Sequence, residues 1–138
     1  MYKLTNGDLF LYITLLLVYI HMTFYMEAEN YWGNIEYKRE LINMTPDKIK
    51  KYATQLKFRI IEGVGTCVYI IGVCDNGAVV GIKQGDIVKC TVIMRNICAE
   101  INAYMSSEKI IDINKENKLL IYVLKNKFNM DNIAYLTG

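Results

Sequence analysis

The chain has 138 residues, of which 53% are hydrophobic and 22% are charged, so it is long enough for one folded domain and short for two. Its formal net charge of +2 is too small to argue for nucleic-acid binding by itself, and its single proline, Pro46, excludes a proline-rich linker. The function therefore has to be sought in local patterns along the chain.

Residues 9–26 form an apolar run with no charged residue between Asp8 and Glu27. As a helix this run is about 27 Å long, close to the hydrocarbon thickness of a bilayer, which makes it a candidate transmembrane anchor. Two alternatives stay open: a buried apolar helix or strand, and a stretch that does not belong to the natural protein. A cleaved signal peptide fits less well, because Lys3 is the one basic residue before the run and no small-residue cleavage motif follows.

Residues 34–42 (NIEYKRELI) alternate between apolar and charged side chains with a period near two. This period predicts a half-buried strand, and Trp32 and Gly33 lead into it. On this interpretation Glu36 and Glu40 are solvated surface charges, because nothing in their spacing indicates that they converge with other acidic residues.

A helix is predicted over residues 45–61. Thr45 suits the N-cap, Pro46 suits the first helical position, and Asp47 favours the positive end of the helix dipole. The predicted core face carries Ile49, Tyr52, Ala53, Leu56 and Ile60 at helical spacing. The opposite face is predicted to carry Lys48, Lys51, Gln55 and Arg59.

Basic residues are concentrated in and around this helix. Lys48, Lys51 and Arg59 are the candidate contacts for nucleic-acid phosphates, with RNA as the expected partner. The alternative is an ordinary solvated helix face, since lysines are common on exposed helices.

The next stretch combines a break, a strand and a turn. Gly63 and Gly65 are expected to end the helix, and residues 66–74 (TCVYIIGVC) predict a central strand covered on both faces. Residues 75–77 (Asp-Asn-Gly) are a strong hairpin signal, so residues 78–82 are expected to return as a strand.

Further elements complete an α+β pattern. A second helix is predicted over residues 84–105, with Asp86 as its capping candidate. Strands are predicted over 108–113 and 118–124, joined by a polar loop at 114–117. The order β-α-β-β-α-β-β predicts a two-layer sandwich, with two helices on one face of a small mixed or antiparallel sheet.

No complete catalytic constellation is visible. His21, the single histidine, lies inside the apolar run, so no Ser-His-Asp or Cys-His arrangement is available. Cys67, Cys74, Cys90 and Cys98 lack the paired spacing of zinc ligands. We expect them to be free thiols that act as small core residues, which favours a reducing compartment.

Five short motifs recur in an order that resembles a known family. They are 35–38 (IEYK), 54–59 (TQLKFR), 69–73 (YIIGV), 75–77 (DNG) and 80–82 (VGI). Their succession resembles the domain that precedes the GTPase module in the GTP-binding protein 1 and 2 family, which are translational-type GTPases similar to elongation factors. The resemblance covers about residues 33–138, and Phe58 stands where the family commonly has tryptophan.

The resemblance implies a function for the longer protein. There a strand leads into a phosphate-binding loop, and residues 133–138 resemble that strand, with Gly138 as the first glycine of the loop. GTP and Mg²⁺ would bind the full-length parent, whereas this chain lacks the lysine and the serine or threonine of the loop and is expected to be inactive alone. Expected partners are a GTPase domain in cis and RNA or the translation machinery.

The expected organisation has three parts. Residues 1–32 are an N-terminal region with the apolar run, residues 33–127 are the accessory domain, and residues 128–138 are a linker and the first strand of the GTPase domain. The resemblance implies a cytoplasmic protein, and a membrane-anchored one is the alternative. Two other functions stay open: a stand-alone nucleic-acid-binding module of the Schlafen/AlbA-like type, and a membrane-anchored interaction domain.

Overall fold

The structure of the chain is a computed structural model that describes residues 11, 26–30 and 32–127. Most of the candidate transmembrane run 9–26, the strand expected at 133–136 and Gly138 lie outside the described residues. Among the residues that the structure describes, no helix is both long enough and apolar enough to cross a bilayer.

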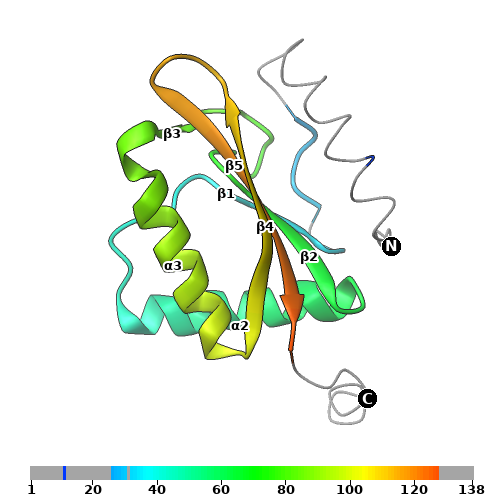
Figure 1. Cartoon of the computed structure of the whole chain (residues 1–138). Helices are drawn as coiled ribbons and strands as arrows, with labels where there is room; N and C mark the ends of the chain where they lie inside the picture. The colour runs from blue at the N-terminus through cyan, green and yellow to red at the C-terminus, as the bar shows by residue number, and fades with distance from the viewer. Residues whose placement is uncertain (1–10, 12–25, 31, 128–138) are drawn as a thin grey trace.

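The described elements confirm the predicted α+β class, with two helices on a five-stranded mixed sheet in the order β-α-β-β-α-β-β (Figure 1). In chain order they are β1 (Ile35–Lys38), α2 (Pro46–Glu62), β2 (Thr66–Ile71), β3 (Ile82–Lys83), the short 3-10 helix η1 (Gln84–Asp86), α3 (Ile87–Glu100), β4 (Ala103–Asp112) and β5 (Asn117–Asn126).

Strand β5 is the centre of the sheet. It pairs antiparallel with β2 along one edge and with β4 along the other, and β3 continues the line of β2 by pairing with the start of β5. Strand β1 pairs parallel with β2 and forms the outer strand on that side. Both helices lie on the same face of this sheet (Figure 1).

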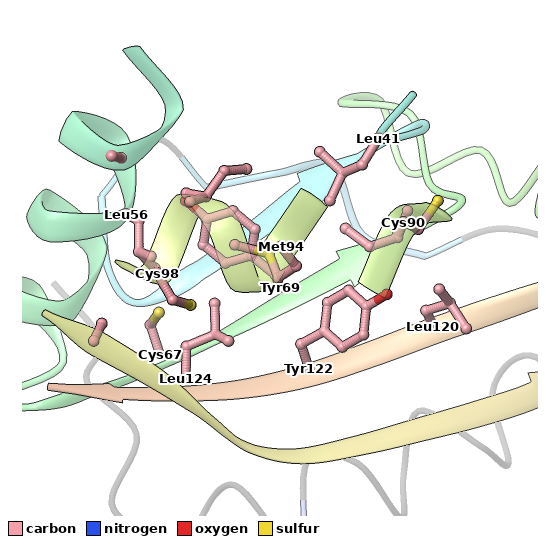
Figure 2. Packing of buried hydrophobic residues seen from close by; sticks show 14 of the residues in the cluster. Leu41, Leu56, Cys67, Tyr69, Cys90, Met94, Cys98, Leu120, Tyr122 and Leu124 are labelled. Carbon is pink, nitrogen blue, oxygen red and sulfur yellow. The ribbon is translucent and has the colours of Figure 1, made fainter. Parts of the chain in front are cut away.

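The main core fills the space between the helices and the sheet (Figure 2). Alternate residues of β2 and β5 point into it, and Leu56 of α2 and Met94 of α3 meet them from above. The remaining alternate residues of β2 and β5 form a second apolar cluster on the opposite sheet face. Strand β2 is therefore buried on both faces, as its uncharged sequence predicts.

Local signals set both ends of α2. The Thr45 hydroxyl accepts a hydrogen bond from the Lys48 backbone N–H at 3.2 Å, and Pro46 takes the first helical position. At the other end Gly65 has a left-handed φ of 105° and donates to the Ile60 carbonyl at 2.9 Å. The predicted capped start and glycine stop are confirmed.

The predicted return strand at 78–82 is wrong. The 75–77 turn is followed by isolated bridge residues, among them the Val73–Val79 pair, and not by a continuous strand, and the chain then leaves β2 to pair with β5 as β3. The two ends of the 72–81 loop lie close together in a neck, where the Gly72 carbonyl accepts a hydrogen bond from the Gly81 N–H at 2.8 Å. A Cβ at Gly72 would stand 2.9 Å from the Gly81 Cα, so the neck needs glycine.

The predicted second helix extends too far. Helix α3 ends at Glu100, and the positive φ of 56° at Asn102 turns the chain so that Tyr104 and Met105 belong to β4. Asp86 occupies the position before α3 but makes no side-chain capping bond. The two last strands are longer than predicted, because β4 is mostly exposed and shows no apolar alternation to mark its length.

Candidate functional site

The outer face of α2 carries an excess of positive charge. Lys48 and Lys51 are exposed, as the sequence predicts. Lys50 and Lys57 are exposed as well, and Asp47 is the one exposed acidic residue of the helix. The exposed part of α2 thus carries four lysines against one aspartate, and Lys48 and Lys51, three residues apart, lie on the same side of it, where they suit an anion.

Arg59 does not lie on that face, and its predicted placement there is wrong. Its side chain is buried, with the residue 4% exposed, and points towards the strand β1 and the segment before it. By helical geometry Arg59 lies only about 60° around the axis from Leu56, which is the margin of the apolar stripe. A residue at this margin can face the neighbouring strand. The position of Arg59 on the helical wheel was therefore compatible with burial, which the sequence analysis did not consider.

The guanidinium group of Arg59 is fully engaged with protein atoms. Nη1 donates to the Gly33 carbonyl at 2.9 Å, and Nη2 donates to the Asn30 carbonyl at 3.0 Å. Nε lies 3.4 Å from a carboxylate oxygen of Glu36. Arg59 therefore connects α2 to β1 and to the chain before β1, and it is not available to bind phosphate.

Glu36 is buried as well, at 5% exposure, so its predicted role as a solvated surface charge is wrong. The apolar residues of β1 face the second cluster, which turns Glu36 and Lys38 towards α2. The polar side of this strand is thus covered by a helix and not by water. The alternation of apolar and charged residues predicted the strand correctly, but it could not show that a helix covers the polar side of the strand.

Glu29 completes the charged cluster, which we define as Glu29, Glu36 and Arg59. Its carboxylate lies 3.7 Å from Arg59 Nη2 and accepts a hydrogen bond from the Tyr37 backbone N–H. Burial, together with the hydrogen bond and negative charge of Glu36, raises the pKa of Glu29 to about 8, against the lowering effects of the Tyr37 N–H and Arg59. The raised pKa favours the protonated form of Glu29 at neutral pH, and the guanidinium group of Arg59 lies beside both carboxyl groups.

The Asp-Asn-Gly turn holds Glu29 in place. The Glu29 N–H donates to the Asp75 carbonyl at 2.7 Å, and the Met26 N–H donates to the Gly77 carbonyl at 2.8 Å. A Cβ at Gly77 would stand 2.1 Å from the Met26 carbonyl oxygen, so only glycine fits. The turn that the sequence marks as a hairpin thus also supports the segment 26–30.

A pocket of about 460 Å³ lies above the charged cluster. Its lining consists of Glu29, Glu36, Lys51, Thr54, Gln55, Phe58 and Arg59. Glu36 and Arg59 are buried and Glu29 is half-buried, whereas the other four lining residues, all on α2, are exposed. The pocket therefore brings one exposed lysine of α2, Lys51, close to the charged cluster.

An aromatic pair stands at the edge of this pocket. Trp32 and Phe58 have ring centroids 6.0 Å apart and planes inclined by 50°. Trp32 is 52% exposed and Phe58 is 42% exposed, so both rings retain surface for a partner. Nearby, Lys38 Nζ donates to Gln55 Oε1 at 2.9 Å and lies 4.3 Å from the centre of the Tyr52 ring.

The cysteines are free thiols of the protein interior, as expected. Cys67, Cys90 and Cys98 are buried, and Cys74 is half-buried. Burial raises the pKa of Cys98 to about 12, so its thiol is a poor nucleophile. Within the described part of the chain, no three His, Cys, Asp or Glu side chains converge in a group that could hold a metal ion.

Comparison with known proteins adds a partial relationship. The chain is 48% identical over 58 residues to GTP-binding protein 2 of Mus musculus and of Homo sapiens, which covers 42% of this chain and 9% of each relative. It is 35% identical over 112 residues to an uncharacterized protein of Acanthamoeba polyphaga mimivirus, covering 80% of this chain and 59% of the viral protein. No family model matches the chain, and no solved structure matches it. Part of the chain is therefore related to GTP-binding protein 2, although the chain spans only a small fraction of that protein.

Proposed function

We propose that this chain is an accessory domain of a GTP-binding protein of the translational type, and that α2 contacts RNA. The 48% identity to GTP-binding protein 2 supports the first part of the proposal. In this proposal residues 33–127 are the domain, residues 128–138 lead into the GTPase module, and Gly138 is the first glycine of its phosphate-binding loop. GTP and Mg²⁺ would be bound by the longer protein.

The nucleotide part of the proposal has a direct test. The 138 residues contain no lysine followed by serine or threonine after a glycine-rich loop, which is what holds the phosphates and Mg²⁺ of a nucleotide. We expect no measurable binding of fluorescent GTP in the presence of Mg²⁺ by this chain. Saturable, Mg²⁺-dependent binding that unlabelled GTP displaces would contradict the proposal.

The outer face of α2 supports the second part. Lys48 and Lys51 lie three residues apart on one exposed side of α2, so both ammonium groups can approach a phosphate backbone together. Each phosphate that a lysine neutralises releases counterions, which makes RNA binding favourable and dependent on salt. This concentration of exposed lysines is the observation that carries the RNA proposal.

Charge reversal on α2 tests that contact. The double variant Lys48→Glu/Lys51→Glu should weaken RNA binding by at least about tenfold, and should lower the salt-dependence slope by about 1.5 for two lost contacts. The matched control is Lys109→Glu/Lys115→Glu, which makes the same charge change at exposed positions of the β4–β5 hairpin.

Fluorescence anisotropy with labelled RNA at several salt concentrations distinguishes the outcomes. If the control loses as much affinity as the α2 variant, only net charge matters and the assigned face is wrong. If the unmodified chain binds no RNA at low salt, the RNA part of the proposal fails.

A further inference from the structure

The Trp32–Phe58 pair is unlike the other exposed apolar residues of the described chain. Val64 is exposed on its own, and Val88 and Val92 form a small aliphatic pair one turn apart on α3, which is normal for a protein surface. Phe58 instead lines the pocket together with Lys51, and its ring lies against the ring of Trp32. Exposed aromatic rings beside lysines are the combination with which proteins bind single-stranded nucleic acid.

The pocket offers polar groups as well as aromatic faces. Thr54 donates its hydroxyl hydrogen to the Lys50 carbonyl at 3.1 Å, which leaves its oxygen as an acceptor. Gln55 uses its Oε1 to accept from Lys38, which leaves its amide nitrogen as a donor. A donor and an acceptor one residue apart on the pocket wall suit the edge of a planar heterocycle.

The size and charge of the pocket also fit an uncharged ring. Its volume of about 460 Å³ is in the range of small-ligand sites, which is about 300–1,000 Å³. Arg59 compensates the negative charge of the Glu29–Glu36 pair within the cluster, so the deep part does not repel a neutral base. Lys51 at the opening is placed for the phosphate that follows such a base.

We propose that this pocket accepts one unpaired base of single-stranded RNA, stacked on Phe58 next to Trp32, with the adjoining phosphate at Lys51. The inference rests on the proposed RNA contact of α2 and adds the form of RNA that it binds. Single strands are favoured because their bases can leave the stack, whereas the bases of a duplex are covered by their neighbours.

Trp32 is the single tryptophan of the sequence, so its emission reports directly on stacking. The full chain is titrated with three probes: single-stranded RNA of ten uridines, an RNA duplex of the same length, and inorganic polyphosphate, which has the charge but no bases. We expect the single strand to quench the tryptophan emission, and we expect the duplex and polyphosphate to leave it almost unchanged.

A variant separates stacking from charge. Phe58→Ala should weaken binding of the single strand by about 5- to 100-fold, because base stacking on an aromatic side chain contributes about 1–3 kcal/mol, and should leave polyphosphate binding unchanged. Because Phe58 is exposed, this variant should keep its thermal unfolding midpoint close to that of the parent chain. The matched control is Tyr104→Ala, which removes an exposed aromatic ring from β4.

Three results overturn the inference. One is equal tryptophan quenching by polyphosphate and single-stranded RNA, and another is equal affinity for duplex and single strand. The third is unchanged single-strand binding in Phe58→Ala while Lys48→Glu/Lys51→Glu still weakens it. In the third case the α2 contact stands and only the base pocket fails, whereas absence of binding to all three probes removes both proposals.

Discussion

Helix α2 borders two buried regions with opposite chemistry. Its Leu56 and Ile60 pack into the apolar core between the helices and the sheet. Its Arg59 enters the charged cluster with Glu29 and Glu36. The core is held by many interchangeable contacts, and the cluster is held by a few specific ones.

The difference concerns what happens when one member is changed. In an apolar core the cost of a change follows the volume and area that are lost, and neighbours adjust in part. In a charged cluster, removal of one partner leaves another buried and uncompensated. The cluster should therefore be more sensitive to a single substitution than the core, even though it contains fewer residues.

The largest expected effect comes from Arg59→Met. The methionine keeps much of the volume, but Glu36 loses its counter-charge and the Gly33 and Asn30 carbonyls lose their donor. We expect a loss of about 3–5 kcal/mol in the free energy of unfolding, measured by urea denaturation. Arg95→Met is the matched control at an exposed position of α3 and should change stability by less than about 0.5 kcal/mol. Equal losses in the two variants would show that the cluster has no special role.

Two tyrosines of the core allow the same kind of comparison, with a smaller expected change in the free energy of unfolding. The hydroxyl of Tyr122 bonds with the Thr91 hydroxyl at 3.0 Å, whereas the buried hydroxyl of Tyr69 has no hydrogen-bond partner within the described residues. Figure 2 shows both rings in the same core. Tyr122→Phe should lower stability by about 1 kcal/mol, and Tyr69→Phe should leave it equal or higher.

Urea denaturation of the two phenylalanine variants gives the comparison, since both remove one oxygen atom from a buried ring. A loss in Tyr69→Phe as large as that in Tyr122→Phe would mean that the Tyr69 hydroxyl is partnered. The core would then resemble the cluster in depending on a specific polar contact.

The smallest effect is expected for Glu29→Gln at a pH below about 4.5, where Glu29 is protonated in both the folded and the unfolded state. Its pKa is raised from 4.5 to about 8 by burial and by Glu36, while Arg59 and the Tyr37 N–H oppose the shift. Between these two values the folded state binds more protons than the unfolded state, so the contribution of Glu29 to stability falls as pH rises. Above about pH 8 both states are ionised, and the loss of stability caused by the raised pKa of Glu29 is complete.

Thermal unfolding measured from pH 5 to pH 9 tests whether stability falls as pH rises. The parent chain should lose more stability across that range than Glu29→Gln does, because glutamine has no proton to release. Parallel curves for the two proteins would show that the pKa of Glu29 is not raised in the folded protein.

Several features could be predicted because they depend on neighbours in sequence. The Thr45 cap, the α2 stripe and the fully apolar β2 are properties of short segments, and each formed where the sequence predicts. The α+β order followed from the same local signals. Predictions failed at 78–82 and at the end of α3, where pairing with the distant β5 and a left-handed Asn102 outweighed local propensity.

The basic residues of α2 also divide into those whose exposure could be predicted from the sequence and one whose burial could not. The sequence predicted that Lys48 and Lys51 are exposed, because both lie outside the apolar stripe of α2. Only the tertiary structure decided that Arg59 is buried against Glu36, 23 residues away, and against the Asn30 carbonyl, 29 residues away. A helical wheel records how far a side chain lies from the core face, and the burial of a charge depends on which distant partners reach it.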